Sequence, residues 1–316
     1  MAGGEVAKDS GELGEKIVAR LLDMFGWIMP DSGVTINCVR SKTHGDEEKS
    51  RLKHGIDNVY QYKSNLIDNT RQDVLISVKC RDKYPVTDKG IKSKFKEFFE
   101  DISMAAECYP SSELYKRRIQ GTKSRKTDGV IFWIDRNDSD GTEYNSLLDK
   151  LDNIRLTETA ALDSLTLVDN KRAQFLYEAI SFIHQKYGRE NVEFFYLDSG
   201  LNNSSLEKIY SGKQLPVEYI SASILPFSVN VNGNTTFILV TEESFDENYL
   251  KRLISLAHSF TRELSSEVVI IFPDYHDMHH KEAVRNAYSS FSSDEFIKKI
   301  KLKKLNPDFR DGVFDE

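Results

Sequence analysis

The spacing of apolar residues divides the chain into alternating helices and strands. Apolar positions three or four residues apart predict amphipathic helices. The segments with this pattern are 10–25, 91–108, 169–187 and 246–264. Short apolar runs between turn-forming residues predict strands. These runs are 34–39, 56–62, 74–80, 129–135, 192–197, 236–240 and 268–272. Together they predict an α/β protein, with a mobile polar loop at 43–53.

A Ser/Asn/Gly-rich stretch, SGLNNSS, begins at Ser199 and is typical of a linker. We therefore expect two units, a larger domain over 1–200 and a smaller C-terminal α/β domain over 201–316. The second unit shows no pattern of catalytic residues of its own. We interpret it as an accessory or partner-docking domain.

Composition places the chain among soluble proteins. It has 316 residues, of which 39% are hydrophobic and 29% charged. An apolar run of membrane-spanning length is absent from the sequence, and so is an N-terminal signal core, so we expect a cytoplasmic protein that does not enter a membrane. Three cysteines, Cys38, Cys80 and Cys108, lack paired spacing and are expected to be reduced thiols.

Charge is unevenly distributed along the chain. The net charge is −7, yet residues 79–126 contain thirteen basic and seven acidic residues, which makes this stretch +6 and the remainder −13. A local basic surface can hold phosphates on an acidic protein because salt screens distant charges. The residues that we expect to contact a DNA backbone are Lys116, Arg117, Arg118, Lys123, Arg125 and Lys126.

The first helix carries an acidic residue on its apolar side. Glu15 precedes Val18, Leu22 and Phe25 by three, seven and ten residues, which places all four on one side of a helix. A carboxylate on a core-facing stripe is costly unless it is paired or bound to a metal. This makes Glu15 a candidate metal ligand.

Two further charged residues lie on neighbouring strands. Asp57 stands at the start of one strand, and Lys79 ends the apolar strand VLISVK. If the strands form a hairpin, the two side chains lie close together. Carboxylates can hold Mg²⁺ or Mn²⁺, which polarises a phosphate, while a lysine orients the attacking water or offsets developing charge. His54, just before this motif, is a candidate contact to a phosphate or a metal-bound water, or simply a loop histidine.

The three segments together resemble the PD-(D/E)XK nuclease superfamily, whose core is the restriction-endonuclease-like fold with a mixed central sheet flanked by helices. The similar segments are GELGEKIVARLLDMFGW, HGIDNVY and VLISVKC. The resemblance covers residues 10–135 and extends toward 200. It is closest to Holliday-junction resolvases and bacterial antiphage-defence nucleases.

The resemblance implies a catalytic set and a biological setting. It assigns Glu15 and Asp57 as ligands of a divalent Mg or Mn ion together with the backbone carbonyl of Val78, and Lys79 as the catalytic lysine. It further implies a DNA endonuclease that acts as the effector of an antiphage or restriction system, with a protein partner encoded nearby. Homo-oligomerisation is left open.

One residue departs from the family pattern. Ser77 stands where the motif has an acidic residue, and a serine brings no negative charge. Some enzymes of this superfamily supply the missing carboxylate from the next helix, where this chain offers Glu97 and Glu100. The alternative is a catalytically decayed module that still binds DNA. An RNA substrate is a third interpretation.

A second cluster of metal-binding residue types follows the strand at 268–272. It consists of Asp274, His276, Asp277, His279 and His280. Histidine suits zinc or manganese, but no other ligand-rich segment pairs with this one. We interpret it as a polar loop between a strand and a helix.

Overall fold

The computed structural model describes residues 2–45, 49–81, 83–136, 146–157, 161–202, 208–261 and 265–306, with only the backbone for residues 2–10 and 294. It divides into two compact units, Met1–Gln174 and Phe175–Glu316. The division falls within helix α4 (Asn170–Tyr187), before the expected boundary at 200. Within the described residues, no helix is long and apolar enough to cross a membrane.

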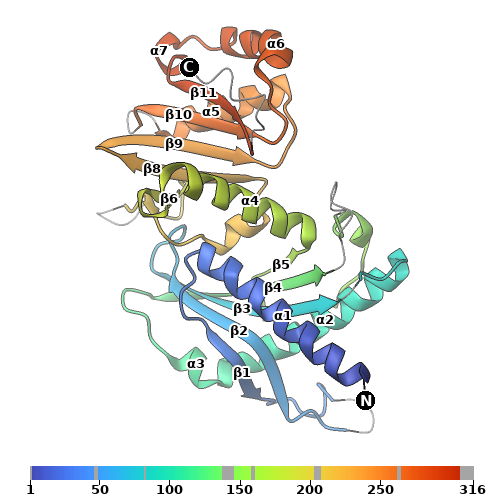
Figure 1. Ribbon diagram of the computed structural model, residues 1–316. Helices are drawn as coiled ribbons and strands as arrows, with labels where there is room; N and C mark the ends of the chain where they lie inside the picture. Colours follow the sequence, from blue (N-terminus) through green and yellow to red (C-terminus); the bar gives the residue numbers. More distant parts are fainter. Residues whose placement is uncertain are drawn as a thin grey trace. The chain divides into compact units, whose positions relative to one another are not determined.

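The first unit is built on a five-stranded mixed sheet with the order β1-β2-β3-β4-β5 (Figure 1). Strands β1, β2 and β3 pair antiparallel, whereas β3, β4 and β5 pair parallel. The elements are α1 (Ala2–Met24), β1 (Asp31–Asn37), β2 (Lys53–Lys63), β3 (Thr70–Arg81), α2 (Asp88–Cys108), η1 (Tyr109–Ser111), α3 (Glu113–Lys116), β4 (Ser124–Asp135), η2 (Asp149–Leu151) and β5 (Ser164–Val168). The expected mixed sheet flanked by helices is thus confirmed.

Helices α1 and α2 cover opposite faces of this sheet. On β3, Val78 contacts the side of α1 at Gly14, and the next residue, Lys79, lies against Phe98 of α2. Adjacent strand residues point to opposite faces, so the two helices flank the sheet. The apolar stripe of α1 and the buried aromatic residues of α2 explain this packing, because each helix buries one side against a strongly apolar sheet.

The hairpin expected from the sequence is present. Strands β2 and β3 pair antiparallel from Asn58↔Ile76 to Lys63↔Arg71. Both strands are longer than the apolar runs that predicted them. For β3 the reason is that it begins with the buried polar residues Thr70 to Asp73. The two parallel strands β4 and β3 remain paired along their whole length, from Thr70↔Ser124 to Arg81↔Asp135.

The second unit contains a six-stranded mixed sheet with the order β11-β10-β9-β8-β6-β7 (Figure 1). Its elements after α4 are η3 (Arg189–Asn191), β6 (Val192–Phe195), β7 (Ser211–Gly212), η4 (Val217–Ser221), β8 (Ile224–Val231), β9 (Asn234–Thr241), α5 (Glu247–Thr261), β10 (Glu267–Phe272), α6 (Asp277–Ser289), α7 (Asp294–Ile297) and β11 (Ile300–Lys304). Residues of α5, β10 and β11 share one buried apolar cluster. The sequence patterns missed β11, because its lysines hide a strand that pairs parallel with β10.

Candidate active site

The predicted catalytic segment lies where two paired strands separate. The pairing of β2 with β3 ends at Asn58↔Ile76. Beyond this point β2 continues beside β1 toward Lys53, and β3 continues beside β4 toward Arg81. The gap between the strands opens at Asp57, Ser77, Val78 and Lys79, a site that we call the fork. Its β3 residues are half-buried, whereas the first seven residues of β3 are buried.

Asp57 is held at the fork by the backbone of β3. The N–H of Val78 donates to the Oδ2 atom of Asp57 over 2.6 Å. The N–H and C=O of one strand residue point toward the same neighbouring strand, so the carbonyl of Val78 faces the fork as well. The structure therefore brings together the carboxylate and the carbonyl that the resemblance assigns as metal ligands.

Lys79 reaches the fork from the face of the sheet covered by α2. Ser77 and Lys79 alternate with Val78 and share the side of Leu75, which belongs to the apolar cluster with α2. The Nζ atom of Lys79 lies 5.4 Å from the centroid of the Phe98 ring. The ring face attracts the ammonium, and this contact orders the lysine side chain.

Glu15 lies on the other side of β3. The preceding residue, Gly14, is buried, and a Cβ there would clash with the Cβ of Cys80 and lie 3.5 Å from Cγ1 of Val78. Only glycine allows this close approach. The side chain of Glu15 itself is exposed. Its expected burial on the core-facing stripe is thus wrong, because Gly14 occupies the position at which the helix touches the sheet.

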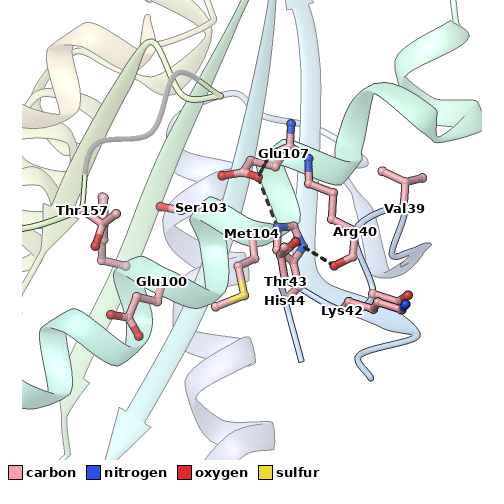
Figure 2. A pocket seen from close by; sticks show the side chains of 12 residues that line it. Val39, Arg40, Lys42, Thr43, His44, Glu100, Ser103, Met104, Glu107 and Thr157 are labelled. Atoms are coloured by element: carbon pink, nitrogen blue, oxygen red, sulfur yellow. Dashed lines mark hydrogen bonds and ion pairs between the residues drawn. The ribbon is translucent and has the colours of Figure 1, made fainter. Parts of the chain in front are cut away.

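The two candidate substitutes for the missing acidic residue are exposed on α2. Glu97 forms an ion pair with Lys94 at 2.7 Å between Oε2 and Nζ. Glu100 lines a pocket formed by α2 and the loop at Val39–His44 (Figure 2). Their roles at the metal stay predictions, and the structure gives Glu97 a partner on its own helix.

The expected DNA-contacting segment lies at the far end of β3. Arg125 pairs in register with Arg71, and Lys79 stands eight residues further along the strand, about 26 Å away. The structure therefore does not bring the basic segment to the fork. Three of its six residues are also engaged in contacts within the chain: Lys116 with Glu113, Arg117 with Asp31, and Arg125 with both Asp73 and the Tyr115 ring. Arg118 and Lys123 are exposed, and Lys126 is half-buried.

A buried charge network occupies that far end. Arg71 and Asp73 are 1% and 0% exposed and form an ion pair at 2.5 Å between Nε and Oδ1. Arg71 also donates to the carbonyl groups of Leu114 and Arg117, and Tyr109 donates to Asp73. This network fastens the segment after α2 to the start of β3. No apolar pattern in the sequence indicates it.

His54 is a buried residue of β2, three positions before Asp57. Its ring is 1% exposed, and its Nε2 atom lies 3.3 Å from Nδ1 of His44. Burial, followed by the charges of Arg51 and His44, lowers the pKa of His54 to about 4. The ring is therefore neutral at pH 7. It belongs to a cluster with Cys38, His44 and Cys108, which the sequence spacing did not reveal.

The histidine-rich segment at 274–280 comprises the end of the loop between β10 and α6, up to His276, and the first turn of α6 from Asp277. His280 stacks on Phe245, with 4.2 Å between the ring centroids, and His276 stacks on His279 at 4.3 Å. Asp274 accepts a hydrogen bond from the N–H of Phe245, and Asp277 accepts one from Tyr275. These contacts account for the cluster as local packing.

The mixed sheet, the two flanking helices and the fork with its aspartate and lysine define a PD-(D/E)XK nuclease fold. Comparison with protein families agrees. The model of one family, described as the GAPS4 protein PD-(D/E)XK nuclease domain, matches residues 1–172. The match covers more than half of the chain, which therefore belongs to this family and is a PD-(D/E)XK nuclease of an antiphage system. No curated protein and no solved structure matches it.

Proposed function

We propose that this nuclease hydrolyses DNA phosphodiester bonds with Mg²⁺ or Mn²⁺ bound at the fork, as the effector of an antiphage defence or restriction system. The main supporting observation is the carboxylate of Asp57, hydrogen-bonded to the N–H of Val78 directly beside Lys79. The family is a nuclease family, and PD-(D/E)XK enzymes generally use divalent metals.

The donor set at the fork suits a hard cation. Asp57 and Val78 offer a carboxylate and a carbonyl oxygen, and Glu15 follows the glycine that packs against Val78. Oxygen ligands are those that Mg²⁺ and Mn²⁺ prefer. When bound, the cation would polarise the phosphate and lower the pKa of a water. Lys79 would orient the attacking water and offset negative charge on the phosphate.

A direct experiment is cleavage of supercoiled plasmid and linear DNA in Mg²⁺ or Mn²⁺, with EDTA as the metal-free control. We expect wild-type cleavage to be lost in Lys79→Ala and in EDTA. The matched control is Lys301→Ala, which removes a lysine that pairs with Glu267 on the second unit's sheet. An excess of single-stranded RNA as competitor separates a DNA substrate from an RNA substrate.

The source of the third carboxylate can be assigned with the same assay. Glu15→Gln, Glu97→Gln and Glu100→Gln each remove one charge and keep the side-chain shape. We expect Glu15→Gln to abolish cleavage, because its helix contacts the β3 residue that binds Asp57. Loss of cleavage in Glu97→Gln or Glu100→Gln instead would assign the migrated carboxylate to α2.

The second candidate function is a decayed DNA-binding module, favoured by the uncharged Ser77. We further propose a regulatory protein partner, encoded nearby, that docks on the second unit. If the wild-type chain alone is inactive, the assay is repeated with the neighbouring gene product. Continued inactivity, together with retained DNA binding, would favour the decayed module. Co-expression with affinity capture tests the partner directly.

A further inference from the structure

Four side chains of metal-binding type converge at one point beside the β1–β2 connection. Cys38 follows β1, His44 lies in the turn after it, His54 is on β2, and Cys108 is the last residue of α2. One ligand atom of each lies within 4.8 Å of all the others. The cluster joins the β1–β2 connection to β2 and to the end of α2, and three of its four members are buried.

Four of the six separations are close to the edges of a tetrahedron around one ion, and the two between Nε2 of His54 and the sulfur atoms are at most 4.8 Å. The sulfur atoms of Cys38 and Cys108 are 3.9 Å apart, and each is 3.5 Å from Nδ1 of His44. That nitrogen is 3.3 Å from Nε2 of His54. Tetrahedral Zn²⁺ with Zn–S of about 2.3 Å and Zn–N of about 2.05 Å requires edges of about 3.8, 3.6 and 3.4 Å for S–S, S–N and N–N pairs.

The cluster is neither a disulfide nor a set of ordinary hydrogen bonds. The two cysteines are free thiols, and their sulfur separation is nearly twice a disulfide bond length of about 2.05 Å. Nδ1 of His44 faces two sulfur atoms and a second imidazole nitrogen at once. A single nitrogen carries one proton or one lone pair, so pairwise hydrogen bonds satisfy only one of these contacts.

A carboxylate orients one of the histidines. Nε2 of His44 lies 3.2 Å from Oε2 of Glu107, and Glu107 also forms an ion pair with Arg40 at 2.5 Å (Figure 2). When Nε2–H donates to Glu107, the lone pair of Nδ1 points into the cluster. Histidine ligands of metals usually make such a contact with their second nitrogen.

We propose that Cys38, His44, His54 and Cys108 bind one Zn²⁺ ion as a structural site, separate from the metal site at the fork. Two thiolates and two imidazoles in a tetrahedron select zinc over the hard cations that oxygen ligands hold. Four protein ligands leave no open position for a substrate, which is the arrangement of structural zinc sites. This inference does not rest on the proposed DNA cleavage.

The ion would fasten the β1–β2 loop to the end of α2. The loop is also held to α2 by the ion pair of Arg51 with Asp101 at 3.0 Å. His54 stands three residues before Asp57 on the same strand, so the zinc would fix β2 at the position from which the fork opens. The loop that the sequence predicted to be mobile would then be a metal-bound segment.

The first test measures zinc by inductively coupled plasma mass spectrometry in protein purified from zinc-supplemented cells without chelators. We expect one zinc per wild-type chain and a background level in Cys38→Ser and Cys108→Ser. Cys80→Ser is the matched control and should retain the ion, because Cys80 lies outside the cluster. A metal-free wild type, or full zinc in the double variant Cys38→Ser/Cys108→Ser, would overturn the proposal.

Two further measurements do not depend on the folding of cysteine variants. Co²⁺ substitution of the wild-type protein should give tetrahedral d–d bands and thiolate charge-transfer bands, and octahedral Co²⁺ without thiolate bands would contradict the site. Glu107→Gln should weaken zinc affinity by about 10–100-fold, since it removes the carboxylate behind His44. Unchanged affinity would show that this carboxylate does not support a ligand.

Discussion

Strand β3 has a closed end and an open end, and an aspartate lies beside a basic residue at each. At the closed end the aspartate belongs to β3 itself, whereas at the open end it is Asp57 of β2. At the closed end, Asp73 and Arg71 are buried with tyrosine and carbonyl partners around them. At the open end, the carboxylate of Asp57 receives one backbone N–H, and Lys79 lies on an aromatic ring. The same residue types thus have very different surroundings at the two ends.

Enclosure separates a charge pair that only stabilises the fold from one that can bind a ligand. Burying a charge is tolerated only when partners surround it, so a fully enclosed pair has no capacity for a ligand. A half-buried carboxylate beside a lysine retains lone pairs that can bind a cation. The two ends can therefore be tested against each other with the same substitution, Asp to Asn.

The largest expected effect is on catalysis at the open end. Asp57→Asn should reduce DNA cleavage by about 1,000-fold, because the carboxylate charge that would hold the cation is lost. The free energy of unfolding of this variant should change by less than about 1 kcal/mol, since the amide oxygen still accepts a hydrogen bond from the N–H of Val78. Plasmid cleavage and urea unfolding measure the two quantities. A variant that cleaves normally would remove Asp57 from the proposed site.

The same substitution at the closed end should act on stability instead. Asp73→Asn leaves the buried Arg71 without its ionic partner, and we expect a loss of about 3–5 kcal/mol in the free energy of unfolding. Both tryptophans of the chain, Trp27 and Trp133, are buried in the first unit, so their fluorescence during urea unfolding reports on that unit. Cleavage per folded molecule should stay within a few-fold of wild type; a 1,000-fold loss would contradict the comparison.

An intermediate effect is expected from the exposed cations near the closed end. Arg118→Ala/Lys123→Ala should lower DNA affinity and reduce the slope of log K against log salt by about 2, if each residue contacts one phosphate. Arg125→Ala should act mainly on stability, because Arg125 lies on the Tyr115 ring and near Asp73. Salt-dependent fluorescence anisotropy with labelled duplex DNA distinguishes the double variant from Arg125→Ala. An unchanged slope in the double variant would exclude this surface from DNA binding.

The smallest expected effect concerns an exposed ion pair beside the buried one. Arg117 binds both carboxylate oxygens of Asp31, but more than half of the Arg117 side chain is exposed. Arg117→Ala should cost less than about 1 kcal/mol, because water screens the pair. Urea unfolding followed by tryptophan fluorescence measures this loss and compares it with the loss in Asp73→Asn. Equal losses in the two variants would show that burial does not separate these pairs.

Periodic apolar patterns predicted most elements of the fold correctly. The helices α2 and α4 and the strands β3, β4 and β10 follow such patterns closely, because their buried faces require them. The patterns missed β5, β7, β8 and β11. In β11 the lysines mask the apolar pattern of a strand. The segment forms a strand because it pairs with β10. Such pairing depends on contacts between segments that the local sequence does not encode.

The candidate site was predicted in part. That β2 and β3 form a hairpin follows from two adjacent strand patterns, so the sequence could indicate that Asp57 lies near β3. It could not indicate that the pairing ends at Asn58↔Ile76. The position of the basic segment could not be inferred, because it depends on the parallel register of β3 and β4. Likewise, the exposure of Glu15 follows from the contact of Gly14 with Cys80, which no helical spacing reveals.

Local sequence patterns are enough to indicate the α/β class, the strand hairpin with its aspartate and lysine, and the resemblance to PD-(D/E)XK nucleases. These features are local, because each rests on residues that are neighbours in the chain or on one element. The folded structure is needed to show where β2 and β3 separate and which charges are enclosed. It is also needed to show that four metal-binding side chains meet, those of Cys38, His44, His54 and Cys108. The physical reason is that these arrangements depend on strand register and helix packing, which bring together side chains up to 70 residues apart.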